Sequence, residues 1–414
     1  MTETTEHDRM QLDALGVPVA SHVPPEVIRR IDLFKGPGMD QDPFVVVQRL
    51  QQEPPIVYNL QNPLFGQSWL PTRGKDIRFV LSNPELFGSD YQAGFSKLIG
   101  ETWRLACVEM DAPAHSKFRL LMNPWFSPAV VARLGDRVTL RAEELVDQIA
   151  EGHGCEFMSA FGAKFPISIF MELMGTSQDR VPEFLQWEND ILHNPNPEIM
   201  RRGVLAMRDY LKEVMMDRRR NPRDDLATYA VQGSFDGRPL TDDEVMSIYF
   251  VLFTGGLDTV AQQLGFHFRH MAMNPGHQQQ LRDDPSKIPQ AVEEYLRCFT
   301  PIQSHRQARQ DLELCGKKIL KGDWITVLHA LGSRDPSEYE DPHSANFDRK
   351  SKRHLAFATG PHLCIGSHLA RREMRSAIEV WLRRVPPFRV RPGSSFNTSG
   401  GFNFAIGRLE LDWD

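Results

Sequence analysis

The chain has 414 residues, of which 48 are Lys or Arg and 54 are Asp or Glu, and its formal net charge is −6. This mild acidity argues against nucleic acid as a partner. The five cysteines are scattered and odd in number, and none forms a Cys-x-x-Cys pair. That pattern argues against a disulfide framework and a structural zinc site, and it suits a reducing cytosol.

Membrane segments are not expected. The first residues, MTETTEHDRMQ, are polar and charged, unlike a signal peptide or an anchor helix. The most apolar run, 245–257, stops at Asp258 and is shorter than the about 20 residues that a membrane-spanning helix needs. Residues 1–40 are interrupted by Pro and Gly and are expected to form an irregular wrap.

The next segment predicts helices at 42–52 and 72–81 and strands at 56–59 and 67–71. Asp42-Pro43 is typical of a helix start, with Pro as the first helical residue. Thr72 is expected to cap the second helix. No periodicity holds from 83 to 110, and a loop of this length in a compact chain is usually a lid, a binding loop or disordered.

His115 and Arg119 are four residues apart, so a helix would place both on one face. Two donors on one face suit a ligand that carries carboxylates. By themselves they fit a solvated charged face better. Further helices are predicted at 128–149, 161–174, 178–193 and 198–220.

Thr241 and Glu244 form a capping box, which predicts the start of a long helix that ends at Asn274. Gly255 and Gly256 lie near its centre, where each costs about 1 kcal/mol relative to alanine. Such a cost needs a reason other than stability.

Asp258 and Thr259 follow these glycines. A hydroxyl beside a carboxylate can organise water for proton transfer. The alternative is a structural salt bridge for Asp258 and a Thr259 hydroxyl bonded back to its own helix. His267 and His270, on the same helix, are interpreted as packing residues and not as metal ligands.

Glu294 and Arg297 are spaced to interact on one helix, and pairs of this kind contribute little when they are exposed. Short strands are expected at 306–319 and 324–328, a helix at 365–384 and a hairpin at 388–413 that turns at Gly400-Gly401. Five residues of the 365–384 helix are expected to face inward: Leu369, Ala370, Ala377, Val380 and Trp381.

The segment 357–366, FATGPHLCIG, places Cys364 between two glycines and just before a helix. Glycines permit the positive φ angles of a tight loop that approaches a flat cofactor. The amino-terminal amides of the helix favour a thiolate. These features suit a metal-ligating cysteine, although a buried free cysteine in a turn is the commoner use of a single Cys.

This segment resembles the haem-binding loop of the cytochrome P-450 family, Phe-x-x-Gly-x-Arg/His-x-Cys-x-Gly, at Phe357, Gly360, His362, Cys364 and Gly366. The resemblance implies a mainly α fold with small β-sheets. It implies one domain over 1–414, with β regions near 56–71, 306–328 and 388–413. A long central helix would lie over haem b, with the cysteine loop and its helix beneath.

The resemblance also implies roles for individual residues. Cys364 would bind the haem iron, and Asp258 with Thr259 would deliver protons. The haem propionates would be held by His115, Arg119, Arg306 and His362. The substrate pocket would comprise Trp103, Val251, Thr254, Gly255, Ile302 and Phe402. A structural network of Glu294, Arg297 and Arg349 would support the cysteine loop.

The implied activity is hydroxylation of a small apolar terpenoid or norisoprenoid, camphor-like or ionone-like, with dioxygen. Trp103 stands where camphor-hydroxylating relatives use a tyrosine hydroxyl, which argues against camphor itself. Because the chain has no GxGxxG motif, electrons would come from a separate protein, and the resemblance implies a [2Fe–2S] ferredoxin with its NADH-dependent reductase. The partner would dock near Arg78, Arg119 and Arg372 of a cytoplasmic monomer. The alternatives are a peroxide-driven peroxygenase and a haem-thiolate sensor without turnover.

Overall fold

The computed structural model describes residues 10–12, 16–62, 66–90, 94–194 and 196–414. Parts of the expected amino-terminal wrap and of the expected 83–110 loop lie outside these residues. The α-helices are α1 (Phe44–Leu50), α2 (Gly74–Ser82), α3 (Gly94–Leu98), α4 (Ala114–Met122), α5 (Pro128–Ala150), α6 (Lys164–Leu173), α7 (Val181–Glu188), α8 (Pro197–Arg220), α9 (Leu226–Val231), α10 (Asp242–Gly256), α11 (Asp258–Met273), α12 (Pro275–Asp283), α13 (Ile288–Cys298), α14 (His329–Ser333) and α15 (Ser367–Arg384).

The strands are short: β1 (Met10–Leu12), β2 (Pro18–Ala20), β3 (Ile28–Arg29), β4 (Ile56–Asn62), β5 (Gly66–Pro71), β6 (Phe87–Gly88), β7 (Gly154–Glu156), β8 (Ser234–Phe235), β9 (Arg238–Pro239), β10 (Gln303–Ala308), β11 (Leu312–Leu314), β12 (Lys317–Ile319), β13 (Trp324–Leu328), β14 (Phe388–Val390), β15 (Thr398–Ser399), β16 (Ala405–Ile406) and β17 (Glu410–Trp413). The largest sheet has the order β3-β4-β5-β13-β10-β6, and a smaller one has the order β14-β17-β7.

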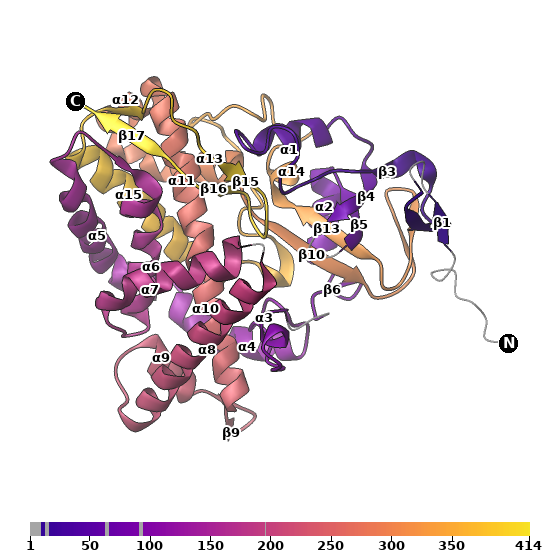
Figure 1. The fold of residues 1–414 in the computed structure, drawn as a ribbon, viewed down its shortest axis with the longest axis horizontal. Coiled ribbons are helices and arrows are strands. Elements are labelled where there is room, and N and C mark those ends of the chain that lie inside the picture. Colours follow the sequence, from indigo (N-terminus) through magenta and orange to yellow (C-terminus); the bar gives the residue numbers. More distant parts are fainter. Residues whose placement is uncertain (1–9, 13–15, 63–65, 91–93, 195) are drawn as a thin grey trace.

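The helices and the main sheet occupy opposite sides of the molecule (Figure 1). Helices α5 to α11 and α15 gather on one side, and the six-stranded sheet lies with α1, α2 and α14 on the other. Buried apolar side chains form one contiguous cluster that extends from Val19 to Trp413. The expected mainly α fold with small β-sheets is therefore confirmed.

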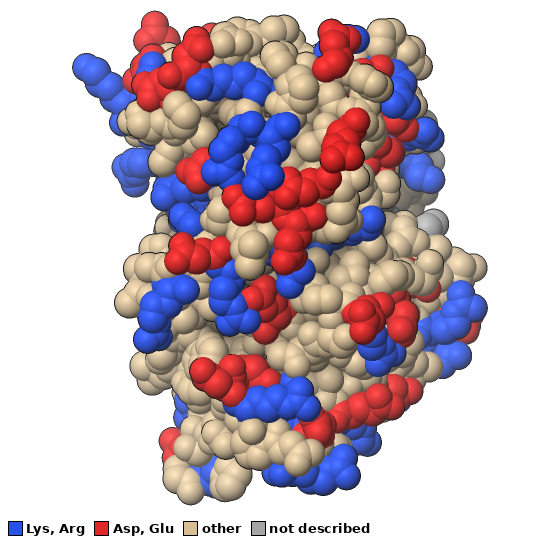
Figure 2. Space-filling model, turned by 90° about the vertical axis from the view of Figure 1, so that its left-hand side faces the viewer, with Lys and Arg blue, Asp and Glu red and all other residues tan. Residues whose placement is uncertain are grey.

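Surface charges of both signs are interspersed over the face shown in Figure 2. Charged side chains of neighbouring helices also form ion pairs, as Arg384 of α15 does with Asp147 of α5 at 2.7 Å. Exposed pairs of this kind contribute at most about 1 kcal/mol each. No broad basic field covers this face, in keeping with the net negative charge.

The central helix begins as the capping box predicts. The backbone N–H of Glu244 donates to Oγ1 of Thr241 at 3.3 Å, and the backbone N–H of Thr241 donates to the Glu244 carboxylate at 2.8 Å. The helix is not continuous, however. It divides at Leu257, whose φ of −100° and ψ of −71° separate α10 from α11. By length and composition alone 242–273 could cross a membrane, but most of it is buried in the core.

Two boundaries differ from the sequence prediction. Thr72 does not cap α2, because its hydroxyl donates to the carbonyl of Pro54 at 2.7 Å and the helix starts at Gly74. The segment 83–110 is not all loop, since it contains β6 and α3. Strand β6 forms by pairing with the distant β10, a tertiary contact that local periodicity does not indicate.

Helix α15 directly follows the cysteine loop and anchors it to the core. Its five residues expected to face inward are all buried. Trp381 packs edge-on against Phe157 and Phe268, with ring centroids 5.2 and 5.1 Å apart. The 388–413 hairpin is also confirmed, with Thr398 opposite Ile406 in its β15–β16 pair.

Candidate active site

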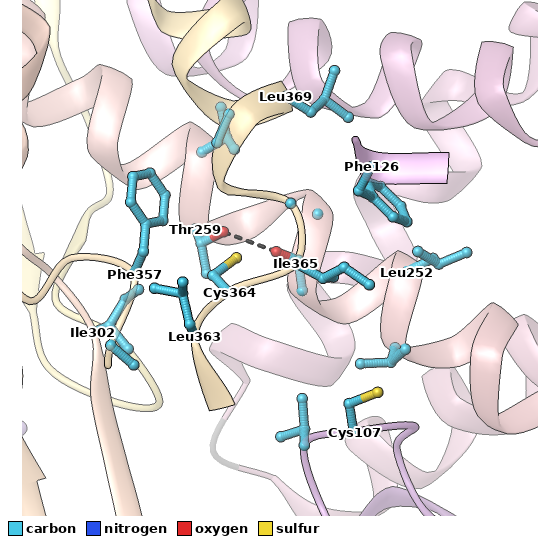
Figure 3. Close-up of a pocket in the computed structure, with 18 of the residues that line it drawn as sticks. Cys107, Phe126, Leu252, Thr259, Ile302, Phe357, Leu363, Cys364, Ile365 and Leu369 are labelled. Atoms are coloured by element: carbon cyan, nitrogen blue, oxygen red, sulfur yellow. Dashed lines mark hydrogen bonds between the residues drawn. The ribbon is translucent and has the colours of Figure 1, made fainter. Parts of the chain in front are cut away.

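A cavity of about 310 Å³ lies between the cysteine loop and the broken central helix (Figure 3). Its walls are largely apolar. From the loop and α15 come Phe357, Leu363, Cys364, Ile365 and Leu369, and from α10 and α11 come Val251, Leu252, Gly255, Gly256 and Thr259. The segment before α4 contributes Ala106, Cys107 and Val108, and Ile302 adds a further apolar wall.

Cys364 reaches this cavity from a loop closed by its own backbone. The N–H of Cys364 donates to the carbonyl of Phe357 at 2.9 Å. Its sulfur is accessible from the cavity but enclosed by protein on its other sides. This enclosure raises the pKa of the Cys364 thiol, while the Gly366 backbone and the charges of Arg119 and Arg371 oppose the rise.

The two loop glycines have different roles. Gly360 has a φ of +72°, and a Cβ there would lie 2.7 Å from the carbonyl oxygen of Leu81, so only glycine fits. Gly366 does not have the expected positive φ. Its φ is −80°, and it is the N-cap of α15, where a Cβ would lie 3.9 Å from the sulfur of Cys364.

The four predicted propionate donors, His115, Arg119, Arg306 and His362, all line the cavity. The rings of His115 and His362 lie 4.4 Å apart, centroid to centroid. Burial first, and then the nearby charges of His362 and Arg119, lower the pKa of His115 to about 4. Its Nε2 is buried and has no hydrogen-bond partner among the described residues. Such an atom calls for a polar partner from a ligand.

These residues fit the haem that the loop motif implies. A Cβ at Gly255 or Gly256 would meet no atom within 4 Å, so the broken helix leaves open space above the cysteine. Cys364 lines the same space. The unpartnered His115 and the neighbouring cations lie where carboxylates could bind. Cys364 would hold the iron, and His115, Arg119, Arg306 and His362 would hold the propionates.

Asp258 and Thr259 differ in their access to the cavity. The Thr259 hydroxyl lines it and donates to the carbonyl of Gly255 at 2.9 Å, the dashed line in Figure 3. The Asp258 carboxylate is buried away from the cavity. It accepts hydrogen bonds from Gln262 and Asn403, each at 2.8 Å, and from Nε2 of His193 at 2.9 Å.

His193 is the partner of Asp258 that the sequence did not indicate. It ends a π-helical turn, η6 (Asn189–His193), whose N-cap is the buried Glu188. Burial tends to raise the pKa of Asp258, but His193, Asn403 and Gln262 outweigh it and hold that pKa below its usual range. Burial tends to lower the pKa of His193, but Asp258 and Glu188 raise it to about 9. No local motif could have predicted a contact between residues 65 positions apart.

Only part of the predicted substrate pocket lines the cavity. Val251, Gly255 and Ile302 do, whereas Trp103, Thr254 and Phe402 do not. The Trp103 ring packs on Phe250 at 4.7 Å between centroids, and its N–H donates to Glu101 at 2.5 Å. The Thr254 hydroxyl donates to the carbonyl of Phe250 at 3.0 Å, and Phe402 packs near Phe95, with ring centroids 5.9 Å apart.

The indole N–H of Trp103 therefore does not face the cavity. Glu101 also forms an ion pair with Arg208 of α8, which ties the segment before α4 to that helix. Residues that line the cavity but carry no sequence signal are Ala106, Cys107, Val108 and Leu252. Their apolar or thiol side chains match no motif, so only their place in the fold identifies them.

Glu294 and Arg297 of α13 form one network with Arg349. Arg297 is fully buried and donates to both carboxylate oxygens of Glu294, at 3.0 and 2.8 Å. Arg349 donates to the same carboxylate at 3.0 Å. Arg297 also donates to the carbonyl of Ser333, whose hydroxyl accepts the backbone N–H of Leu355 at 2.9 Å. This chain of bonds leads to the start of the cysteine loop.

Other predicted positions have ordinary structural partners. Arg78 pairs with Glu338, and Arg372 donates to the carbonyl of Gly135 at 2.9 Å and to the hydroxyl of Thr139 at 3.0 Å. His267 is buried against Gln263, with 2.8 Å between Nε2 and the amide nitrogen. In the described ranges, no group of three or more His, Cys, Asp or Glu side chains could hold a metal ion.

Comparisons with known proteins agree with this architecture. Residues 167–399, more than half of the chain, match the family model described as Cytochrome P450. The probable cytochrome P450 127A1 of Sinorhizobium fredii is 38% identical over 403 residues, which cover 96% of this chain and 97% of the relative. The linalool 8-monooxygenase of Pseudomonas putida is 27% identical, over 88% of this chain and 94% of the relative.

Among solved structures, that of cytochrome P450 CYP101C1 matches with a TM-score of 0.87 and 29% identity, over 96% of this chain and 100% of that chain. The family match, the relative at 38% identity and the cysteine loop agree with one another. The chain therefore belongs to the cytochrome P450 family, whose cofactor is haem b, and it is a monooxygenase similar to bacterial members of that family.

Proposed function

We propose that this monooxygenase hydroxylates a compact, apolar terpenoid or norisoprenoid, with Cys364 as the iron ligand and Asp258 with Thr259 in proton delivery. The reaction is R–H plus O₂, two electrons and two protons, giving R–OH and water. Haem bound through a thiolate supplies the activation of dioxygen and the cleavage of its O–O bond. The observation that carries the proposal is the one cavity shared by Cys364, Thr259 and an apolar wall.

The apolar wall supports the substrate class. Val251, Leu252, Ile302, Ala106 and Val108 offer hydrocarbon surface, and the indole N–H of Trp103 is occupied by Glu101. A substrate would therefore bind mainly by burial of apolar area, at about 25 cal/mol per Å². The linalool 8-monooxygenase that this chain resembles carries a terpenoid in its name, which favours the same class.

Thr259 and Asp258 supply the proton chemistry in this proposal. The Thr259 hydroxyl can exchange its bond to Gly255 for one to water in the cavity, because both groups border that cavity. Asp258 is one residue earlier and is ionised, so it can accept and pass on a proton. A positioned acid–base group of this kind contributes about 10²–10⁴-fold to a rate.

Electrons would come from a [2Fe–2S] ferredoxin and its NADH-dependent reductase, in a cytoplasmic and monomeric enzyme. Of the three arginines proposed for docking, Arg78 binds Glu338, Arg372 binds the α5 backbone, and Arg119 donates to the carbonyl of Leu363 in the cysteine loop at 2.9 Å. The test is the effect of salt on the rate of ferredoxin reduction of the haem. An electrostatic docking site predicts a fall in that rate as salt rises.

A peroxide-driven peroxygenase would not need Thr259, which separates it from the proposal. We expect Thr259→Ala to lower product formed per NADH by about tenfold or more and to release peroxide instead. Thr254→Ala is the matched control, because Thr254 also bonds to the carbonyl four residues earlier but does not line the cavity. Equal coupling in both variants would remove Thr259 from proton delivery.

The substrate class is tested by a spectral screen of terpenoids and norisoprenoids with the ferric enzyme. Ligands of the right class should displace the iron-bound water and shift the Soret band. Polar sugars and organic acids of similar size should not. A preference for the polar compounds would contradict the proposed class, and no spectral response with any ligand would favour the sensor.

A further inference from the structure

The carboxylate of Asp258 connects the active site with a second group of ionisable residues. It does not line the cavity, and it is held by Gln262, Asn403 and His193. Gln262 and Asn403 are neutral amides that cannot exchange a proton with it at neutral pH. His193 is therefore the only one of these three partners that can supply Asp258 with a proton.

His193 lies between the buried carboxylate and the solvent. Its side chain is 31% exposed, against 3% for Asp258, and its Nε2 donates to Oδ1 of Asp258 at 2.9 Å. It is the last residue of the π-helical turn η6, at the junction of α7 and α8. Single π-turns are frequent at functional sites. The imidazole therefore spans the route from the surface to Asp258.

Glu188 adds a second ionisable group to this junction. It is the N-cap of η6, five residues before His193, and its carboxyl group is buried. Its Oε1 has no hydrogen-bond partner among the described residues. Burial, and then the charge of Asp258, raise the pKa of Glu188 to about 8, although His193 opposes the rise. A buried carboxyl oxygen without a hydrogen-bond partner is costly and needs a reason.

We propose that His193 is the outer member of a proton path that ends at Asp258, with the buried Glu188 at the other end of the same π-helical turn. The proposal rests on the role in proton delivery proposed above for Asp258 and Thr259. His193 positions Asp258 and also passes protons to it. The proton on Nε2 of His193 moves to Oδ1 of Asp258, and the imidazole ring then takes a replacement proton from solvent. Neutral Asp258 is no longer bound to a cation and can turn toward Thr259. Each proton that enters the cavity is thus replaced at the surface.

The groups that face one another in this path are few. His193 contacts Asp258 of α11, and the charges of Asp258 and of Glu188 in α7 both act on it, while the charges of Asp258 and His193 act on Glu188. The C-terminal hairpin contributes the neutral Asn403, and α11 also contributes the neutral Gln262. At pH 7, His193 is charged and Glu188 is neutral. Above about pH 8, Glu188 ionises, and near pH 9 His193 loses its proton, so the supply of protons falls.

Three variants separate proton transfer from a structural role. His193→Arg keeps a cation beside Asp258 but cannot release a proton, because arginine stays protonated. Glu188→Gln keeps the shape of the side chain without the ionisation. His153→Gln, at an exposed histidine, is the control. For each variant we would measure the pH profile of coupled turnover, the solvent deuterium isotope effect and the urea midpoint of unfolding.

A readout without turnover is the NMR titration of His193 in the reduced, carbonyl-bound holoenzyme with ¹³C-labelled histidine. The resonance is assigned by its absence in His193→Gln. We expect its midpoint well above the ordinary value of about 6.5. Glu188→Gln should lower the midpoint by at least about half a unit, and Asp258→Asn by more than one unit.

In turnover, His193→Arg should lose the alkaline limb of the pH profile, and its rate of coupled turnover should fall about tenfold. Its solvent deuterium isotope effect should be larger, while its urea midpoint of unfolding should not change. The proposal is overturned if His193→Arg keeps the profile and isotope effect of the unmodified enzyme, or if His193 titrates at its ordinary value. A failure of the proposed function looks different. Thr259→Ala would then leave coupling intact, whereas the NMR midpoints would still report the His193–Asp258 contact and the influence of the Glu188 charge on His193.

Discussion

Arg297→Met should destabilise the protein severely. The Arg297 side chain is fully buried and gives two bonds to Glu294 and one each to the carbonyls of Ser333, Pro342 and Ser344, at 3.1, 2.8 and 3.0 Å. Its loss leaves the buried Glu294 charge with Arg349 as its remaining cation. Removal of one partner from a buried ion pair costs about 3–5 kcal/mol. That is a large share of the 5–15 kcal/mol typical of a folded domain.

The chain offers a matched control. Glu198 and Arg201 have the same Glu-x-x-Arg spacing on α8, but their side chains are 79% and 46% exposed. Arg201→Met should change the free energy of unfolding by less than about 1 kcal/mol. The assay is urea unfolding followed by far-UV circular dichroism and by the Soret band. Similar urea midpoints for both variants would refute the argument that the buried network supports the cysteine loop.

Three further outcomes are expected. Gly265→Ala should cost about 1–3 kcal/mol in urea unfolding, because its Cβ would meet Ile406, whereas Gly276→Ala, in open space, should be neutral or stabilising; equal effects would contradict this. Burial, and then the charge of His270, lower the pKa of His267 to about 3 in the folded protein. Between pH 6.5 and 3 the unfolded chain therefore binds more protons than the folded chain, and the free energy of unfolding falls as the pH falls. His267→Gln should reduce this slope by up to about 1.4 kcal/mol per pH unit, and an unchanged slope would refute it. Trp103→Phe should change substrate affinity by less than about threefold in spectral titrations, because the indole N–H binds Glu101; a tenfold loss would mean that it binds the substrate.

Local patterns predicted those elements whose cause is local. The capping box at Thr241 and Glu244 marks the start of α10, and the apolar spacing of α15 identifies the face that Trp381 buries. The cost of two adjacent glycines in the central helix called for a reason other than stability, and the structure breaks that helix one residue later, at Leu257. Thr72 shows the limit, because a competing carbonyl from Pro54 takes its hydroxyl.

The parts of the site that could not be predicted depend on contacts between distant residues. Glu294-x-x-Arg297 and Glu198-x-x-Arg201 have the same spacing, and only the fold makes the first buried and the second exposed. Trp103 was placed in the substrate pocket by position along the chain. The direction of its ring depends instead on Glu101, which itself pairs with Arg208 on α8.

The haem-thiolate chemistry was predictable because the cysteine loop is one continuous segment. The residue that pairs with the proposed proton donor was not predictable. Asp258 and Thr259 are adjacent in sequence, so their pattern is visible without a structure. The partner of Asp258 is His193, in a segment without a recognisable motif. An ion pair between such segments becomes apparent only after α7, α8 and α11 have packed together.

The most direct test of the account is the absorption spectrum of the reduced, carbonyl-bound holoenzyme. Thiolate ligation by Cys364 predicts the thiolate-type Soret band in the unmodified protein and its loss in Cys364→His. Cys107→Ser is the control, because Cys107 is a second cysteine that lines the same cavity, and this variant should keep the band. A band that survives Cys364→His, or that disappears in Cys107→Ser alone, would contradict the assignment of Cys364 as the iron ligand.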